Sequence, residues 1–416
     1  MMYNIRLSGC KYNRIEVFSR IAFFSKYTAS LQPHYMSEVS THSIRQNRIA
    51  LSVFFFIAGI RFASWASRIP DIQNHLHLND AGLGSVLLAL PMGSISGLPL
   101  SGYLINKFGS RNILLLASLS FPVAMIFIGL AANVWQLALV LYFFGMTGNI
   151  MNISMNTQAV GLEALYGKSI MASFHGLWSL AGFTGAAFGT WMIAINISPF
   201  YHFMIICVLS LIMTIFCFKY TLQHDHGKTN SNKIFVKPDQ VIFILGLIAF
   251  SSMVCEGTMF DWSGVYFHKV IKVREGLTTM GYVAFMSTMA GGRFIGDFMI
   301  TRYGAKKILQ ISGMIIFSGL MIAVIFPTII NATIGFLLVG IGVSSVVPLS
   351  YGLAGKSKKL SPSVAIASVS SIGFLGFLIG PPTIGFIAQA FNLRWSFALI
   401  ACLGLGTTFV SGKLKL

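Results

Sequence analysis

The amino-acid sequence predicts an all-α, polytopic membrane protein in which twelve transmembrane helices form two six-helix, pseudo-symmetric bundles. Three observations support this fold class. Hydrophobic residues make up 55% of the 416 residues and charged residues only 10%, whereas a soluble domain carries about 25% charged residues. The apolar residues gather in runs long enough to cross a membrane. The two halves of the chain also share a sequence repeat.

The apolar runs give the individual helices in chain order. A hydrocarbon core of about 30 Å requires roughly 20 predominantly apolar residues in a helix. Runs of this length occur at 49–67, 81–103, 112–132, 135–157, 172–195 and 200–219, and then at 241–267, 276–300, 306–327, 330–353, 364–388 and 393–413. Helices of the second, tenth and eleventh runs are expected to bend at Pro91, Pro99, Pro348, Pro381 and Pro382.

Lysine and arginine are distributed unevenly over the loops between these runs. One side of the predicted membrane holds most of them, and the other holds only Arg68, Lys269, Lys272, Arg274 and Arg394. Cytoplasmic loops carry the excess of basic residues, so both termini are predicted to be cytoplasmic in a plasma membrane, the inner membrane of a bacterium. The net charge of +18 is therefore a topology signal, and no nucleic-acid partner is expected.

The runs also divide the chain into regions. Residues 1–47 are predicted to be a disordered cytoplasmic tail, or to follow from a start codon placed too early, since Met36 also precedes the first span. A basic membrane-surface segment is the alternative. Residues 48–219 and 241–416 are the two predicted bundles, and 220–240 is a polar cytoplasmic linker. The 5 cysteines form no CxxC pair, so neither a metal nor a cofactor is expected.

The internal repeat appears when the sequence is shifted by 195 residues, which carries Gly97 onto Gly292 and Gly109 onto Gly304. The aligned segments read Gly-Leu-Pro-Leu-Ser-Gly-Tyr-Leu-Ile-Asn-Lys-Phe-Gly-Ser-Arg and Gly-Arg-Phe-Ile-Gly-Asp-Phe-Met-Ile-Thr-Arg-Tyr-Gly-Ala-Lys. Repeats of this kind place a binding site near the bilayer midplane between the halves, with access that alternates between the two sides.

The first copy of the repeat resembles a known signature. Gly102-x-x-x-Asn106-Lys107-x-Gly109-x-Arg111 is similar to the loop between helices 2 and 3 of the major facilitator superfamily. A closer resemblance, to the bacterial branch around the rhizopine-associated membrane protein MosC, rests on Asn152-x-x-x-Asn156-x-Gln158, Ser173-Phe-His-Gly-Leu-Trp178 and Glu256-Gly-x-x-x-Asp261-Trp262. The resemblance implies a secondary transporter with the twelve-helix fold of that superfamily.

The resemblance also implies a gate at the signature loops. It comprises Asn106, Lys107, Gly109 and Arg111, and in the second copy Arg302 and Gly304. The acid of the usual signature is replaced by Asn106 and Thr301, so the lock that this acid helps to form must be altered here. Arg293 and Asp297, spaced i, i+4, are expected to pair with each other beside the gate.

Ionisable residues inside the predicted membrane are candidates for function because burying a charge there is costly. Arg61 and Glu256 fall at nearly symmetry-related levels of the first and seventh helices. They are expected to pair across the halves or to hold a solute jointly, unless each satisfies a separate structural partner. Glu256 is the leading candidate for proton coupling, since a carboxylate that alternates between an apolar and an arginine-paired environment can take and release a proton. Asp261 is the second candidate, with capping of the outer gate as its alternative role.

Polar and aromatic side chains extend the predicted binding site. Asn149, Asn152 and Asn156 form one stripe on the fourth helix, suited to binding hydroxyl groups or to bonding other helices. His175 and Trp178 follow on the fifth helix as ligand candidates. For His175 a proton relay and a packing residue are the alternatives. Trp65 and Trp262 are predicted as stacking platforms or membrane-interface anchors.

Other classes of protein fit the sequence less well. Gly355-Lys356-Ser357 and Gly167-Lys168-Ser169 lack the opening glycine of a phosphate-binding loop, and no HExxH or paired-aspartate site of an enzyme occurs. A sensor that binds a solute without transporting it remains an alternative. We predict a monomeric, proton-coupled carrier that moves a small polar organic solute, sugar- or cyclitol-like, through the lipid bilayer. The alternative is a proton-driven efflux pump for lipophilic or cationic compounds.

Overall fold

The computed structural model describes residues 43–166, 170–223, 239–357, 359–360 and 362–414. Within these ranges the chain is helical and contains no strand. The predicted tail and linker fall mainly on 1–42 and 224–238, outside the described residues. The first helix begins at Ile44 rather than at residue 49, because Ser43 and Gln46 form a capping box at its N-terminus.

The described residues of the first half form eight α-helices. They are α2 (Ile44–Ser67), α3 (Ile69–His75), α4 (Asp80–Leu87), α5 (Ala89–Phe108), α6 (Ser110–Gly129), α7 (Val134–Tyr166), α8 (Met171–Ala194) and α9 (Pro199–Phe218). The third and fourth predicted runs, 112–132 and 135–157, are separated by the short segment between Gly129 and Val134.

In the second half, the part of the chain that the structure describes forms seven α-helices and two short helices of other types. They are α10 (Gln240–Tyr266), η1 (Phe267–Ile271), η2 (Glu275–Leu277), α11 (Met280–Tyr303), α12 (Ala305–Ile325), α13 (Ile329–Val343), α14 (Val346–Ala354), α15 (Pro362–Ala390) and α16 (Leu393–Gly412).

Eleven helical segments in the described part of the chain are long and apolar enough to cross a membrane. The remaining expected span, 276–300, is the eighth in chain order and corresponds to α11, whose 24 residues are long enough to cross a membrane. The composition of α11 explains why it is not among the eleven segments, because glycine, serine, Arg293 and Asp297 dilute its apolar residues. The protein is therefore an all-α, multi-pass integral membrane protein.

Two of the predicted spans are broken into pairs of helices, each just before a proline. The second span changes from α4 to α5 at Leu88, and the tenth changes from α13 to α14 at 344–345. A proline ring clashes with the carbonyl four residues earlier. For Pro91 this carbonyl belongs to Leu87, and for Pro348 it belongs to Ser344. Pro381 and Pro382, in contrast, lie inside the continuous helix α15.

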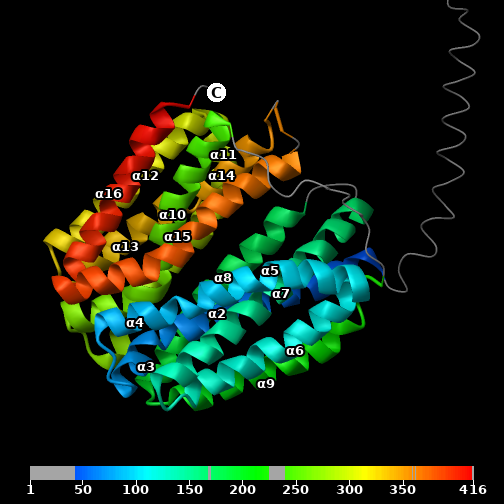
Figure 1. The fold of residues 1–416 in the computed structure, drawn as a ribbon, viewed down its shortest axis with the longest axis horizontal. Coiled ribbons are helices and arrows are strands. Elements are labelled where there is room, and N and C mark those ends of the chain that lie inside the picture. The colour runs from blue at the N-terminus through cyan, green and yellow to red at the C-terminus, as the bar shows by residue number, and fades with distance from the viewer. Residues whose placement is uncertain (1–42, 167–169, 224–238, 358, 361, 415–416) are drawn as a thin grey trace, which may run out of the picture.

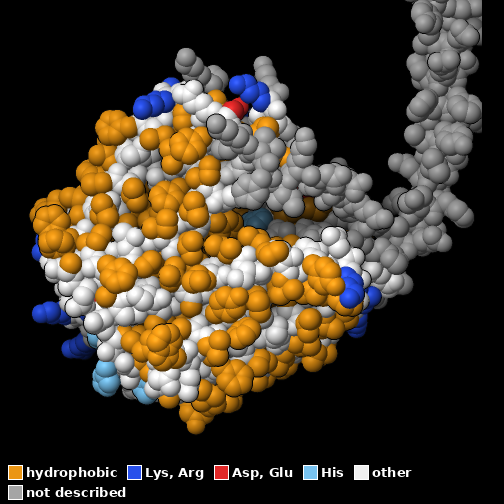
Figure 2. All heavy atoms as spheres, in the orientation of Figure 1, with side chains coloured by type: hydrophobic (Ala, Val, Ile, Leu, Met, Phe, Trp, Pro, Cys, Tyr) orange, Lys and Arg blue, Asp and Glu red, His pale blue; other side chains and the backbone are white. Residues whose placement is uncertain are grey.

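The helices gather in two groups that follow the two halves of the chain (Figure 1). In the first group α5 packs on α7 and α2 on α8, and in the second α10 packs on α15 and α12 on α16. The groups meet where α4 contacts α15 and where α8 contacts α11. Hydrophobic side chains cover most of the face shown in Figure 2, and lysine and arginine side chains lie toward its ends.

Candidate functional site

A cavity of about 310 Å³ lies between the two groups of helices. Its volume is at the lower end of the range of roughly 300–1,000 Å³ that is typical of small-molecule sites. The first half contributes residues of α2, α4, α5, α6, α7 and α8, and the second half contributes residues of α10 and α15. Most of the lining is apolar, and aromatic rings are prominent: Phe62, Phe121, Phe144, Trp178, Phe260, Phe374 and Phe377.

Four of the site residues predicted from the sequence line this cavity: Asn149, Asn152, Trp178 and Asp261. The two asparagines come from α7, Trp178 from α8 and Asp261 from α10. The cavity therefore brings together residues that lie more than a hundred positions apart in the sequence.

The polar groups of the cavity are incompletely satisfied by the protein. The Asn149 Oδ1 atom is buried and accepts no hydrogen bond from the described residues. Asn152 is engaged by its neighbour, since Asn156 donates its Nδ2 to the Asn152 carbonyl at 2.8 Å and to Oδ1 at 3.1 Å. Asp261 makes no hydrogen bond or ion pair with any residue that the structure describes. Each half thus contributes to the cavity lining one residue that has an acceptor without a donor.

Arg61 lies outside the cavity, in the interior of the first half. Its guanidinium donates to Ser210 Oγ at 3.1 Å, to Met151 Sδ at 3.1 Å and to the Ser118 carbonyl at 3.3 Å. It also lies 5.4 Å from the centre of the Phe121 ring, and this ring lines the cavity. The side chain is fully buried, and its partners belong to three neighbouring helices of the same half, α6, α7 and α9.

The expected pairing of Arg61 with Glu256 does not occur in this structure. Glu256 instead faces Arg293 of α11, with Oε2 and Nη2 separated by 4.0 Å, and Ser252 donates to its Oε1 at 3.5 Å. The physical reason is local: each charge finds partners on adjacent helices of its own half. In this structure Arg61 and Glu256 each contact separate partners, as the alternative expectation has it.

Arg293 connects the halves at the level of Glu256. While Nη2 faces Glu256, Nη1 donates a short hydrogen bond to Ser179 Oγ of α8 in the other half. The Nε atom has no partner among the described residues. Asp297 lies one turn further along α11, and its side chain is outside the described part of the structure, so the expected Arg293–Asp297 pair is not described.

The remaining predicted ligands do not line the cavity. Trp65 and Trp262 are buried, and their indole nitrogens have no hydrogen-bond partner among the described residues. The Trp65 ring packs 6.5 Å from that of Phe144, so it supports the cavity wall from behind. His175 is exposed, and the Phe55 ring meets it edge-on at 5.5 Å.

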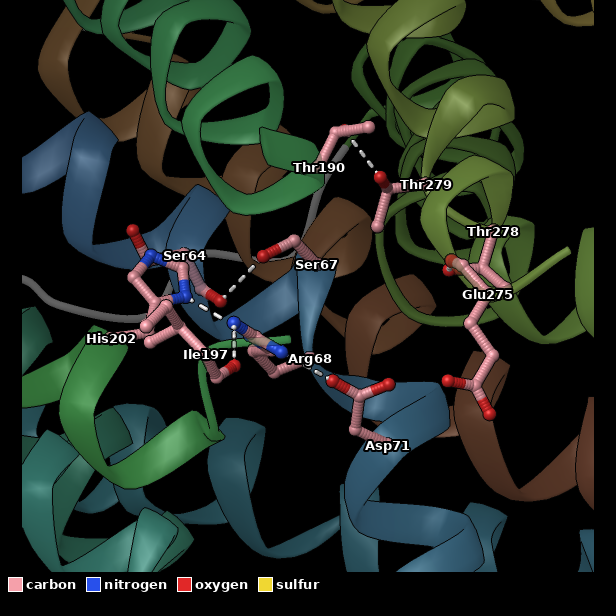
Figure 3. A network of polar contacts seen from close by, with 10 residues as sticks. All are labelled: Ser64, Ser67, Arg68, Asp71, Thr190, Ile197, His202, Glu275, Thr278 and Thr279. Atoms are coloured by element: carbon pink, nitrogen blue, oxygen red, sulfur yellow. Dashed lines mark hydrogen bonds and ion pairs between the residues drawn. The ribbon is translucent and has the colours of Figure 1, made fainter. Parts of the chain in front are cut away.

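The halves are joined tightly at one end of the molecule, formed by residues 68–80 and 267–279, which we call the closed end. Lys269 Nζ lies 2.5 Å from Asp80 Oδ1, and the Asn74 amide lies 3.2 Å from the His268 ring nitrogen. Thr190 of α8 also bonds to Thr279 at the start of α11, as Figure 3 shows. Polar pairs thus bridge the halves at several points of the closed end.

An arginine organises the first half at the closed end. Arg68 follows the last residue of α2, and its guanidinium contacts Asp71 at 2.6 Å, the Ile197 carbonyl at 2.7 Å and His202 Nδ1 at 3.1 Å (Figure 3). Burial raises the pKa of the Asp71 carboxyl, and the hydrogen bond from Arg68 acts in the opposite direction. The network ties the ends of α2, α3 and α9 together.

Comparison of the sequence with known proteins identifies the family of this chain. The model of the Major Facilitator Superfamily matches residues 49–364. The chain belongs to the major facilitator superfamily. It is 34% identical over 374 residues to an uncharacterized MFS-type transporter of Yersinia pestis, covering 90% of this chain and 94% of that protein. The membrane protein MosC of Rhizobium meliloti is 30% identical over 358 residues, covering 86% and 87% of the two chains.

A solved structure agrees in fold. The bacterial homolog of the human lysosomal transporter Spinster, in an inward-facing and occupied conformation, superposes with a TM-score of 0.71 at 14% identity. The match covers 88% of this chain and 96% of that one. This facilitator-superfamily protein is thus a transporter and not an enzyme, and its resemblance to the MosC branch is confirmed.

The two signature loops of this facilitator-superfamily chain have the same backbone conformation. Gly109 joins α5 to α6 with φ 79° and ψ 151°, and Gly304 joins α11 to α12 with φ 82° and ψ 149°. Lys107 lies against the rings of Tyr103 and Phe108, and Asn106 is exposed. Arg111 donates to Thr221 Oγ1 at 3.2 Å, and Arg302 lies 5.6 Å from the Tyr303 ring centre.

Sequence reasoning missed the aromatic wall of the transporter's cavity. Phe62, Phe260 and Phe377 carry no signal that separates them from the 36 phenylalanines of the chain, because every transmembrane helix contains such residues. It also missed the Ser179 contact of Arg293 and the pairing of Asp80 with Lys269, whose positions are 189 apart.

Proposed function

We propose that the protein is a secondary active carrier that binds one small organic solute in the 310 Å³ cavity and releases it by alternating access. The observation that carries this proposal is the position of the cavity. It lies between the two halves and is lined by Asn149, Asn152 and Asp261, and the polar pairs of the closed end bridge the same two halves. Rocking of 48–219 against 241–416 would break the polar pairs of the closed end and expose the same cavity to the other side.

The basic loops give the orientation that we propose for this cycle. Lys107, Arg111, Arg302 and Lys306 lie at the ends of helices opposite to the closed end. If these loops are cytoplasmic, as the lysine and arginine bias predicts, the termini are cytoplasmic and the closed end faces outward. The structure then corresponds to an inward-facing carrier in the bacterial inner membrane, acting as a monomer.

Proton coupling is assigned to Glu256 in this proposal, with Asp261 as the second candidate. Glu256 is buried and shares Arg293 with Ser179 of the other half. Protonation of Glu256 would remove the negative charge that faces Arg293. Movement of α8 against α11 would change the contact between the Arg293 guanidinium and Ser179. A carboxylate placed at such a junction links proton binding to the movement of the halves.

Two classes of solute fit the cavity. A sugar- or cyclitol-like solute is supported by the two amides of α7 and by the Trp178 ring, which provides a stacking surface. The alternative, a lipophilic or cationic compound, is supported by the aromatic lining and by the unpaired Asp261.

The carrier proposal is tested by counterflow in proteoliposomes that contain the purified protein. Liposomes preloaded with a candidate solute should accumulate its labelled form, and a proton gradient should drive net movement. Glu256→Gln should retain counterflow and lose the response to the gradient, whereas Glu163→Gln, outside the cavity and the Arg293 junction, should retain both. Net uptake that proceeds at an unchanged rate in Glu256→Gln would remove the coupling role.

A further inference from the structure

We propose that the cavity recognises its solute through a protonated amine, with Asp261 as the counter-ion and the aromatic wall as the surface for an apolar body. The substrate class is therefore an organic cation. This inference rests on the proposed carrier function and decides between its two classes of solute.

Asp261 lacks a partner among the described residues. Other carboxylates near the interface of the halves have cations: Glu256 faces Arg293, Asp80 faces Lys269 and Asp71 faces Arg68. Asp261 lines the cavity and has no hydrogen bond or ion pair with a described residue. A carboxylate in an apolar environment is costly unless a cation or hydrogen-bond donors compensate it. A bound ammonium group would supply both.

The wall around Asp261 is rich in aromatic rings. Phe260 precedes Asp261 on α10, and its ring meets Phe62 of the other half edge-on at 5.2 Å. Gly257 lies one turn before Asp261, and a Cβ atom there would approach the Phe377 ring to 3.1 Å, so this ring packs directly on α10. Aromatic faces attract ammonium groups, and the attraction grows when water is excluded.

The polar groups that remain free in the cavity lining are acceptors. Asn149 Oδ1 is a buried acceptor without a donor among the described residues, and the Asp261 carboxylate accepts hydrogen bonds only. An ammonium group carries up to three donors and no acceptor, which matches a pair of free acceptors on opposite halves. A polyol presents many donors and acceptors at once, and the mainly apolar lining would leave most of them unpaired.

The test uses pairs of compounds that differ only in the charged group. The purified full-length protein is titrated with 2-phenylethylamine and 2-phenylethanol, and with cyclohexylamine and cyclohexanol, while its thermal stability is followed. Myo-inositol represents neutral polyols. A charge-assisted hydrogen bond in a buried site contributes enough for the amine of at least one pair to bind about tenfold or more tightly than its alcohol.

Three variants assign this preference to Asp261. Asp261→Asn should reduce the preference to about threefold or less, whereas Asp261→Glu, which keeps the charge, should retain it. Asp239→Asn is the matched control, because it removes a carboxylate from the start of the same helix and asparagine preserves the N-cap that Asp239 provides. It should behave as the unmodified protein does.

The outcomes separate this inference from the carrier proposal. Equal binding of amine and alcohol in every pair, or a preference that persists in Asp261→Asn, overturns the inference. If myo-inositol shows counterflow that Asp261→Asn leaves unchanged, the inference fails and the carrier proposal stands. If an amine binds through Asp261 and shows no counterflow, the carrier proposal fails and the inference stands.

Discussion

Asp80 of α4 and Lys269 of η1 form a 2.5 Å ion pair that bridges the two halves of the molecule at the closed end. Asp80 also accepts a 3.0 Å hydrogen bond from Gln73, so the carboxylate is held in position by its own half. The lysine is the more exposed partner, with a third of its side chain accessible. The pair thus connects an acceptor held by its own half to a more exposed donor in the other half.

Removal of this pair should favour opening of the closed end. An ion pair that remains partly exposed contributes about 0.2–1 kcal/mol, so Lys269→Met should shift the ratio of closed to open molecules by up to about fivefold. The measurement is the distance distribution between spin labels at His75→Cys and Arg274→Cys, in a background without the native cysteines. Both label positions are exposed.

The matched control is Lys272→Met, which removes an exposed lysine from the same loop. It should leave the distance distribution unchanged. If Lys269→Met and Lys272→Met give the same distribution, the pair does not hold the closed end.

Close packing of α4 on α15 should contribute more to closure than the ion pair. A Cβ atom at Gly84 would lie 2.7 Å from the Pro381 carbonyl oxygen and 3.0 Å from the Gly385 Cα atom. Gly84→Ala therefore acts as a wedge between the halves, and overpacking of this kind costs about 1–3 kcal/mol. The same spin labels should report a larger open population than in Lys269→Met. Gly102→Ala, at a position with nothing within 4 Å, should have no such effect.

The helices were predictable from the sequence because each depends on its own residues. A run of apolar residues sets the length of a span, and a proline disrupts the helix about four residues earlier. Both rules act locally. They therefore place α4, α5, α11, α13 and α14 to within a few residues. The proline rule does not hold at Pro99, Pro381 and Pro382, which lie inside continuous helices.

The partners of the candidate site residues were less predictable because they depend on how helices from distant parts of the sequence pack. Arg61 was recognised as a buried charge, yet its partners Ser118, Met151 and Ser210 come from three other helices. No sequence spacing relates these four positions. The sequence repeat places Arg61 and Glu256 at a similar height in the membrane, but this height does not fix which face of a helix a side chain occupies.

Substitution of Gly304 should destabilise the protein through the backbone alone. Its φ of 82° and ψ of 149° belong to a region that residues with a side chain rarely adopt, at a cost of about 1–3 kcal/mol. Nothing lies within 4 Å of a Cβ atom at this position, so a steric clash does not add to the effect. Gly304→Ala should lower the free energy of unfolding by that amount, as measured in a denaturant titration.

Gly352 supplies a control for this prediction because it also has open space around it but lies inside α14. Alanine in a helix is favoured over glycine by about 0.5–1 kcal/mol, so Gly352→Ala should leave the protein unchanged or more stable. A similar loss of stability in both variants would contradict the backbone explanation.

The Glu256–Arg293 pair should show energetic coupling in a double-mutant cycle. Removal of one partner leaves the other charge buried and unpaired, which costs about 3 kcal/mol or more. Glu256→Gln and Arg293→Met should therefore each lower the melting temperature in detergent. The double variant contains neither charge, so its loss of stability should be smaller than the sum of the two single losses, with a coupling energy of about 1–3 kcal/mol.

Ser179→Ala separates the two roles of Arg293 in this cycle. The variant removes the hydrogen bond to the other half and keeps the charge pair with Glu256. The coupling energy between Glu256 and Arg293 should then be preserved, because the two residues belong to the same half. Strictly additive losses from Glu256→Gln and Arg293→Met would show that the 4.0 Å separation carries no interaction. In that case Glu256 would have to exchange its proton without help from Arg293.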